Sequence, residues 1–104
     1  MSAMKRLFQL MAEKKASDVF LSVGSPINIK INGVAMPVNQ TLLTADAVKQ
    51  LLYEVLNEYQ IREYESEMEL NTAFAMEGIG AFRISAMRQK GTPAVVVRFI
   101  PGSI

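Results

Sequence analysis

The dipeptide Asn32-Gly33, set between two short apolar-patterned runs, is the feature that most constrains the fold of this chain. Isoleucines alternate with polar residues over 27–31, and a second run, 34–38, follows the dipeptide. Both residues of an Asn-Gly pair tolerate the positive φ that a two-residue hairpin turn requires. The sequence therefore predicts an antiparallel hairpin with one buried face, and Pro37 indicates that its second strand either lies at a sheet edge or is short.

Further strands are predicted at both ends of the chain. They span 18–23, 70–77, 82–87 and 95–99. The last three are separated only by Gly78-Ile79-Gly80 and Lys90-Gly91, which are turn sequences. Strands joined by turns this tight must run antiparallel, because a parallel pair needs a long crossover connection.

Three segments have helical periodicity. The first follows Ser2 as N-cap and ends near Lys15, the second follows Thr44, and the third spans 58–67 after Asn57. Asn57 with a glutamine three residues later is typical of a capping box. The residues expected on the buried faces are Met4, Leu7, Phe8 and Met11, then Val48, Leu51, Leu52 and Val55, then Ile61, Tyr64 and Met68.

The predicted fold is a single α+β domain in the order α–β–β–β–α–α–β–β–β. A chain of 104 residues fits one domain, and half of its residues are hydrophobic, which suffices for a modest core. We expect an antiparallel sheet with its helices packed on one face.

The composition excludes several kinds of chemistry. The chain has no cysteine and no histidine, so disulfides, thiolate metal sites and imidazole acid–base catalysis are ruled out. Its net charge of +1 and the lack of a basic, aromatic-rich stretch argue against nucleic acid as a partner. No apolar run is long enough for a membrane span or a signal peptide, and we expect a cytoplasmic protein.

One glycine pattern and one cluster of carboxylates are better explained by a turn and a solvated helix face than by a binding site. Gly78-x-Gly80 lacks a third glycine, and the P-loop pattern GxxxxGK[ST] does not occur, so the glycines are assigned to a turn. The acidic residues over 63–69 have no histidine or oxygen-rich loop beside them, so we interpret them as a solvated helix face without metal.

Two arginines, Arg83 and Arg98, are the candidate functional residues. If Lys90-Gly91 is a two-residue loop, the ladder sets Arg83 opposite Arg98, on one face of the sheet. A register shifted by two residues would leave them diagonal on that same face. Like charges in such positions repel. The guanidinium forks could instead bind an anion such as phosphate. The alternative is a surface pair that is solvated or bridged by glutamate. Arg88 has the opposite parity and is expected to be exposed near the turn.

The chain resembles the type IV pilus retraction ATPases over nearly its whole length. The residues that carry the resemblance are Lys14-Lys15-Ala16-Ser17-Asp18-Val19-Phe20-Leu21, Val23-Gly24-Ser25-Pro26, Ile29-Lys30-Ile31-Asn32-Gly33, Gly80-Ala81-Phe82-Arg83-Ile84-Ser85 with Gln89, and Val97-Arg98-Phe99-Ile100-Pro101. Many PilT-type members have histidine where this chain has Phe20, so the resemblance favours the PilU-type branch.

The resemblance implies a PAS-like N-terminal domain over 1–100 and the start of an interdomain linker over 101–104. The RecA-like motor domain that follows in the family, with its ATP and Mg sites, is absent from the sequence, so this chain alone is expected to be inactive and to hold no cofactor. The full protein would be a cytoplasmic hexamer at the inner-membrane base of the pilus. Each N-terminal domain would pack on the motor domain of a neighbouring subunit, and the hexamer would act on the pilus platform indirectly.

The resemblance also implies a role for the arginines. In the family, strand arginines of this domain reach the nucleotide phosphates as the domains close, in the manner of an arginine finger. By motif these are Arg83 and Arg98, with Arg88 as a weaker third candidate. Two other classes of function stay open: a PAS-like sensor that binds a small ligand, and an interaction module in which the arginines have no nucleotide role.

Overall fold

The computed structural model describes residues 2–102, which form three helices and six strands in the predicted order. The elements are α1 (Ala3–Lys14), β1 (Asp18–Ser22), β2 (Asn28–Ile31), β3 (Val34–Pro37), α2 (Ala45–Tyr53), α3 (Glu58–Glu67), β4 (Glu69–Met76), β5 (Gly80–Gln89) and β6 (Thr92–Pro101). Pro101 thus belongs to β6, and positions 103–104 of the expected linker lie outside the described residues.

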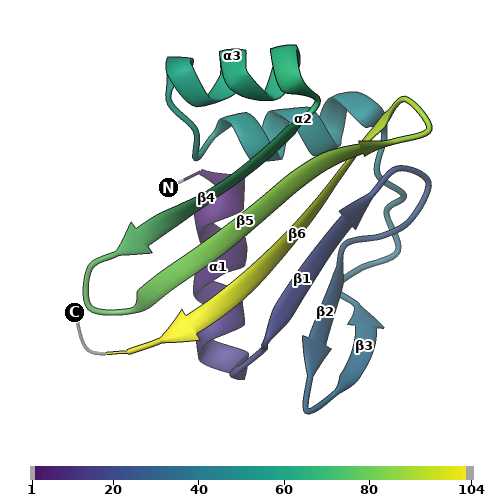
Figure 1. Ribbon diagram of the computed structural model, residues 1–104. Helices are drawn as coiled ribbons and strands as arrows, with labels where there is room; N and C mark the ends of the chain where they lie inside the picture. The colour runs from purple at the N-terminus through teal and green to yellow at the C-terminus, as the bar shows by residue number, and fades with distance from the viewer. Residues whose placement is uncertain (1, 103–104) are drawn as a thin grey trace.

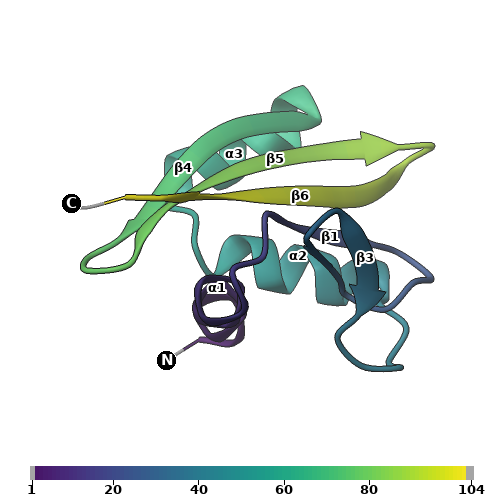
Figure 2. The same cartoon turned by 90° about the horizontal axis from the view of Figure 1, so that it is seen from below.

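The strands form one antiparallel sheet in the order β3-β2-β1-β6-β5-β4 (Figure 1). Two three-stranded meanders, β1–β3 and β4–β6, are joined where β1 pairs with β6. Helices α1 and α2 cover one face of the sheet, and the other face is left open (Figure 2). The predicted α+β, PAS-like architecture is confirmed.

Helix α3 packs along the edge strand β4, on the helix-covered side of the sheet. Its Gln60 donates a hydrogen bond of 2.9 Å from Nε2 to Oγ1 of Thr72 on β4. Its Tyr64 is fully buried, and the phenol donates to the backbone carbonyl of Met87 at 3.1 Å. These two bonds tie the helix to two neighbouring strands.

The predicted helix caps are confirmed. Ser2 and Thr44 accept hydrogen bonds from the backbone N–H groups three residues on, and Asn57 forms a reciprocal capping box with Gln60. The predicted burial of Met68 is wrong, because the residue is 51% exposed. Met68 is the C-cap of α3 with φ 65°, and this left-handed conformation ends the helix before its side chain reaches the core.

Stacked aromatic rings fill the core beneath β5 and β6. The ring of Phe8 on α1 stacks on Phe82 at a centroid distance of 4.3 Å, and Phe82 stacks on Phe99 at 4.9 Å. Phe74 on β4 lies 5.9 Å from Phe8. This column fixes α1 against the centre of the sheet, and so determines which strand residues face away from it.

Candidate functional site

The β5–β6 hairpin has the register predicted from its turn. Gln89 lies opposite Thr92, and Arg83 lies opposite Arg98. The two loop residues, Lys90 and Gly91, have φ of 53° and 81°, as a two-residue hairpin loop with positive φ requires. The cross-strand pairing of the two arginines is therefore confirmed.

Both arginines project from the open face of the sheet. Their strand neighbours Phe82, Ile84 and Val97 are at most 1% exposed and point into the core. Because side chains alternate along a strand, Arg83 and Arg98 point the opposite way, and the side chain of Arg98 is 71% exposed. Helices α1 and α2 lie against the opposite face of the sheet (Figure 2).

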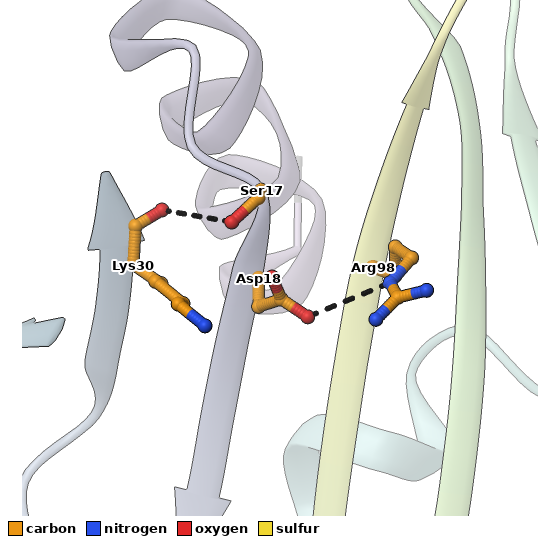
Figure 3. A network of polar contacts seen from close by, with 4 residues as sticks. All are labelled: Ser17, Asp18, Lys30 and Arg98. Atoms are coloured by element: carbon orange, nitrogen blue, oxygen red, sulfur yellow. Dashed lines mark hydrogen bonds and ion pairs between the residues drawn. The ribbon is translucent and has the colours of Figure 1, made fainter. Parts of the chain in front are cut away.

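A third strand adds an acidic residue to the pair. Asp18 on β1 lies opposite Arg98, and its Oδ2 is 3.6 Å from Nε of Arg98 (Figure 3). On its other side, Asp18 lies opposite Lys30 of β2. The sheet thus aligns four charged residues in one row, in the order Lys30, Asp18, Arg98 and Arg83.

The row borders a hollow of about 560 Å³ on the open face. Its lining residues are Asp18, Arg83, Ser85, Val96, Arg98 and Ile100. Three cations and one carboxylate leave the row with an excess of positive charge. Within residues 2–102, Arg98 and Asp18 form the one ion pair, so Arg83 has no acidic partner there. Guanidinium donors that lack a carboxylate can bind an incoming oxyanion.

The structure does not bring Arg88 to this site. Arg88 shares the parity of Phe82 and Ala86, so it lies on the helix-covered side, with its guanidinium 5.8 Å from the ring centroid of Tyr64. Its Nε is buried without a hydrogen-bond partner. The prediction that Arg88 is exposed is wrong, because α3 supplies an aromatic ring that covers it.

The environment of Arg88 affects the nearby tyrosine. Burial raises the pKa of Tyr64 above its ordinary value, and the positive charge of Arg88 opposes this shift. An arginine over an aromatic face gains a cation–π attraction. These contacts give Arg88 a packing role between β5 and α3.

Asp18 is a site residue that the sequence does not reveal. Its partner Arg98 is 80 positions away, and only the pairing of β1 with β6 brings them together. The one local sign of its position is that Asp18 begins a strand. Two apolar residues of that strand, Val19 and Leu21, are fully buried. That signal does not identify which strand lies alongside.

Neither a metal site nor a membrane span is found in the part of the chain that the structure describes. No group of three or more acidic residues within 2–102 could hold a metal ion. None of the three helices in this range combines the length and apolar character needed to cross a membrane.

Sequence comparison relates the chain to pilus ATPases, although no protein-family model matches it. It is 38% identical over 100 residues to the type IV pilus ATPase PilU of Pseudomonas aeruginosa, covering 96% of this chain and 26% of PilU. It is 31% identical over 98 residues to the PilT retraction ATPase of the same organism, covering 94% of this chain and 28% of PilT.

Structural comparison gives the same relationship. A crystal structure of the pilus retraction motor PilT with bound ADP superposes on the whole chain with a TM-score of 0.84 and 25% identity, over 30% of that protein. The Legionella pneumophila ATPase DotB shares the fold, with a TM-score of 0.77 and 18% identity over 94% of this chain and 28% of DotB.

The antiparallel sheet with helices on one face has the architecture of a PAS-like domain. The chain spans only about a quarter of the length of the curated relatives it matches. Within that span it belongs to the PilT/PilU family of type IV pilus ATPases, and it corresponds to their N-terminal domain.

Proposed function

We propose that this domain serves a hexameric type IV pilus retraction ATPase by packing on the motor domain of a neighbouring subunit and presenting Arg83 and Arg98 to the phosphates of bound ATP. The observation that carries the proposal is the direct pairing of two arginines on the uncovered face of the sheet. Like charges facing each other across a ladder cost stability. A bound polyanion would turn that cost into an attraction.

The relatives support the nucleotide part of the proposal. PilU and PilT are named as pilus ATPases, and the PilT crystal structure carries ADP. In the full protein the motor domain would supply the ATP and Mg sites, at the cytoplasmic base of the pilus. An arginine delivered by a moving domain neutralises phosphate charge and couples domain closure to the nucleotide state.

Alanine substitutions in the full-length ATPase that contains this domain test the proposal. We expect Arg83→Ala and Arg98→Ala each to lower ATP turnover at least about tenfold, since arginine fingers contribute that much or more. Arg62→Ala is the matched control, because it removes the same charge from an exposed position on α3, and turnover should persist. Unchanged turnover in both Arg83→Ala and Arg98→Ala would contradict the phosphate role.

The isolated domain provides a second test. We expect it to have negligible ATPase activity and weak or no nucleotide binding, because it offers only part of a shared site. Tight ATP binding by the domain alone, measured by calorimetry, would be inconsistent with the proposal.

A second candidate function is binding of a small apolar ligand or a partner segment. A separate hollow of about 680 Å³ lies between the end of α1 and the β4–β5 turn, and its lining includes Ala12, Ala16, Ile79 and Phe99. A ligand bound in this hollow would shift or broaden the NMR signals of these residues. Chemical-shift changes confined to this hollow, with no effect of the arginine substitutions on turnover, would favour this alternative.

A further inference from the structure

Asp18 is a largely buried carboxylate on a face that is otherwise open to solvent. The residue is 8% exposed, and its side chain is 12% exposed against 71% for that of Arg98. Burying a charged group is costly unless an opposite charge compensates it. Lys30 and Arg98 flank Asp18 on the two neighbouring strands. The ion pair with Arg98 therefore offsets part of the cost of burial, and Lys30 adds a second positive charge on the neighbouring strand.

The manner of contact leaves most of the Arg98 guanidinium free. Oδ2 of Asp18 approaches Nε, and at 3.6 Å the interaction is an ion pair rather than a hydrogen bond. The contact drawn in Figure 3 is made to Nε and to neither terminal nitrogen of Arg98. These terminal N–H groups form the fork that binds a phosphate oxygen pair. Asp18 therefore attracts Arg98 without occupying its phosphate-binding end.

Without the Asp18 carboxylate, few contacts would hold the Arg98 side chain in one conformation. Its side chain is mostly exposed, and its nearest cross-strand neighbour on β5 is another arginine. Repulsion from Arg83 and the rotational freedom of a long side chain would both scatter the guanidinium. The carboxylate on β1 opposes both effects, because it lies on the far side of Arg98 from Arg83.

We propose that Asp18 is a positioning residue that draws Arg98 toward β1 and aims its terminal N–H groups at the bound phosphate. This inference rests on the proposed function of the arginine pair and adds a third residue to it. If Asp18 acted only through its charge, its removal would have the opposite effect on turnover, since a carboxylate near an anion site weakens anion binding. Removing the charge therefore distinguishes positioning from competition.

The test uses the full-length ATPase, with kcat and KM for ATP measured separately. Asp18→Asn retains the size of the side chain but removes its charge, and we expect kcat to fall about fivefold while KM changes by less than about twofold. Asp18→Glu should restore most of the lost kcat. Glu63→Gln, at an exposed site on α3, removes the same charge and should leave both constants unchanged. Asp18→Ser should match Asp18→Asn, and it replaces that variant if Asp18→Asn does not fold.

A double variant separates positioning from general destabilisation. In an Arg98→Ala background, Asp18→Asn should cause no further loss of kcat, because there is no guanidinium left to orient. An equal additional loss in that background would overturn the inference in favour of a structural role. A rise in turnover for Asp18→Asn alone would overturn it in favour of competition.

The outcomes also keep the two proposals apart. If Arg98→Ala lowers turnover but Asp18→Asn does not, only the positioning inference fails. If Arg98→Ala leaves turnover unchanged, the phosphate role of Arg98 fails, and the positioning role that depends on it fails as well.

Discussion

The two faces of the sheet are built from the same strands, yet one face forms the hydrophobic core and the other presents charged residues to solvent. On β5 and β6 the helix-covered face has Phe82, Ile84 and Val97, which are buried almost completely. The alternate positions on the open face have Arg83 and Arg98, which are exposed to solvent. Since side chains alternate along a strand, neighbouring residues can be assigned separately to folding and to function. Substitutions on the two faces should therefore have effects that barely overlap.

The largest difference should come from adjacent residues on β5. Phe82→Ala removes a ring stacked between Phe8 and Phe99, and we expect a loss of about 3–5 kcal/mol in the free energy of unfolding. Arg83→Ala should change it by less than about 0.5 kcal/mol. Urea denaturation followed by circular dichroism measures both. Comparable losses in the two variants would show that the open face contributes to folding as much as the core.

A smaller difference in the free energy of unfolding is expected between substitutions of two tyrosines of α3, Tyr64 and Tyr59. Tyr64→Phe removes the hydroxyl that donates to the carbonyl of Met87, and should cost about 0.5–1.5 kcal/mol through the loss of that hydrogen bond. Tyr59 is 79% exposed, so Tyr59→Phe should be neutral in the same denaturation experiment. If Tyr64→Phe were also neutral, water would be replacing the lost bond, and the docking of α3 would not depend on it.

The smallest effect is expected only at high pH and concerns Tyr53. Burial, together with a hydrogen bond of 2.8 Å that its phenol donates to Glu65, raises the pKa of Tyr53 from 10.0 to about 12. The unfolded chain then loses this proton at lower pH than the folded one. The contribution of Tyr53 to stability is complete below pH 10 and is lost as the pH rises toward 12.

Tyr53→Phe provides the measurement for this last prediction. Between pH 10 and 12 the variant should lose stability less steeply than the unchanged protein. The difference in absorbance at 295 nm between the two should titrate with a midpoint near pH 12. A midpoint close to the ordinary tyrosine value would contradict the raised pKa.

Local rules were sufficient to predict most of the fold. The caps at Ser2, Thr44 and Asn57 depend on side chains three residues from their partners, and the turn at Lys90-Gly91 sets the arginine register by itself. Such features span few residues, so sequence spacing determines them. The α+β class and the element order follow from them.

Contacts between distant segments could not be predicted in this way. The pairing of β1 with β6 decides that Asp18 meets Arg98, and no turn connects those strands. The covering of Arg88 by Tyr64 likewise depends on where α3 docks. Met68 was assigned to the core from periodicity, but the helix ends at that residue. Each of these depends on tertiary packing, which periodicity does not encode.

The pairing of β1 with β6 also governs the order in which the chain can fold. Among the described strands β6 is the last to be synthesised, and it lies between β1 of one meander and β5 of the other. Until β6 leaves the ribosome, β1 and β5 each have an unpaired edge, and unpaired edges invite association with other chains. Joining the halves also closes a loop from Ser22 to Ala94, which is entropically slow. The sheet can therefore be completed only after β6 has been synthesised. In a nascent chain stalled before β6, strands β1–β3 and strands β4–β5 would stay separate, and each group would have an unpaired edge that can associate with other chains.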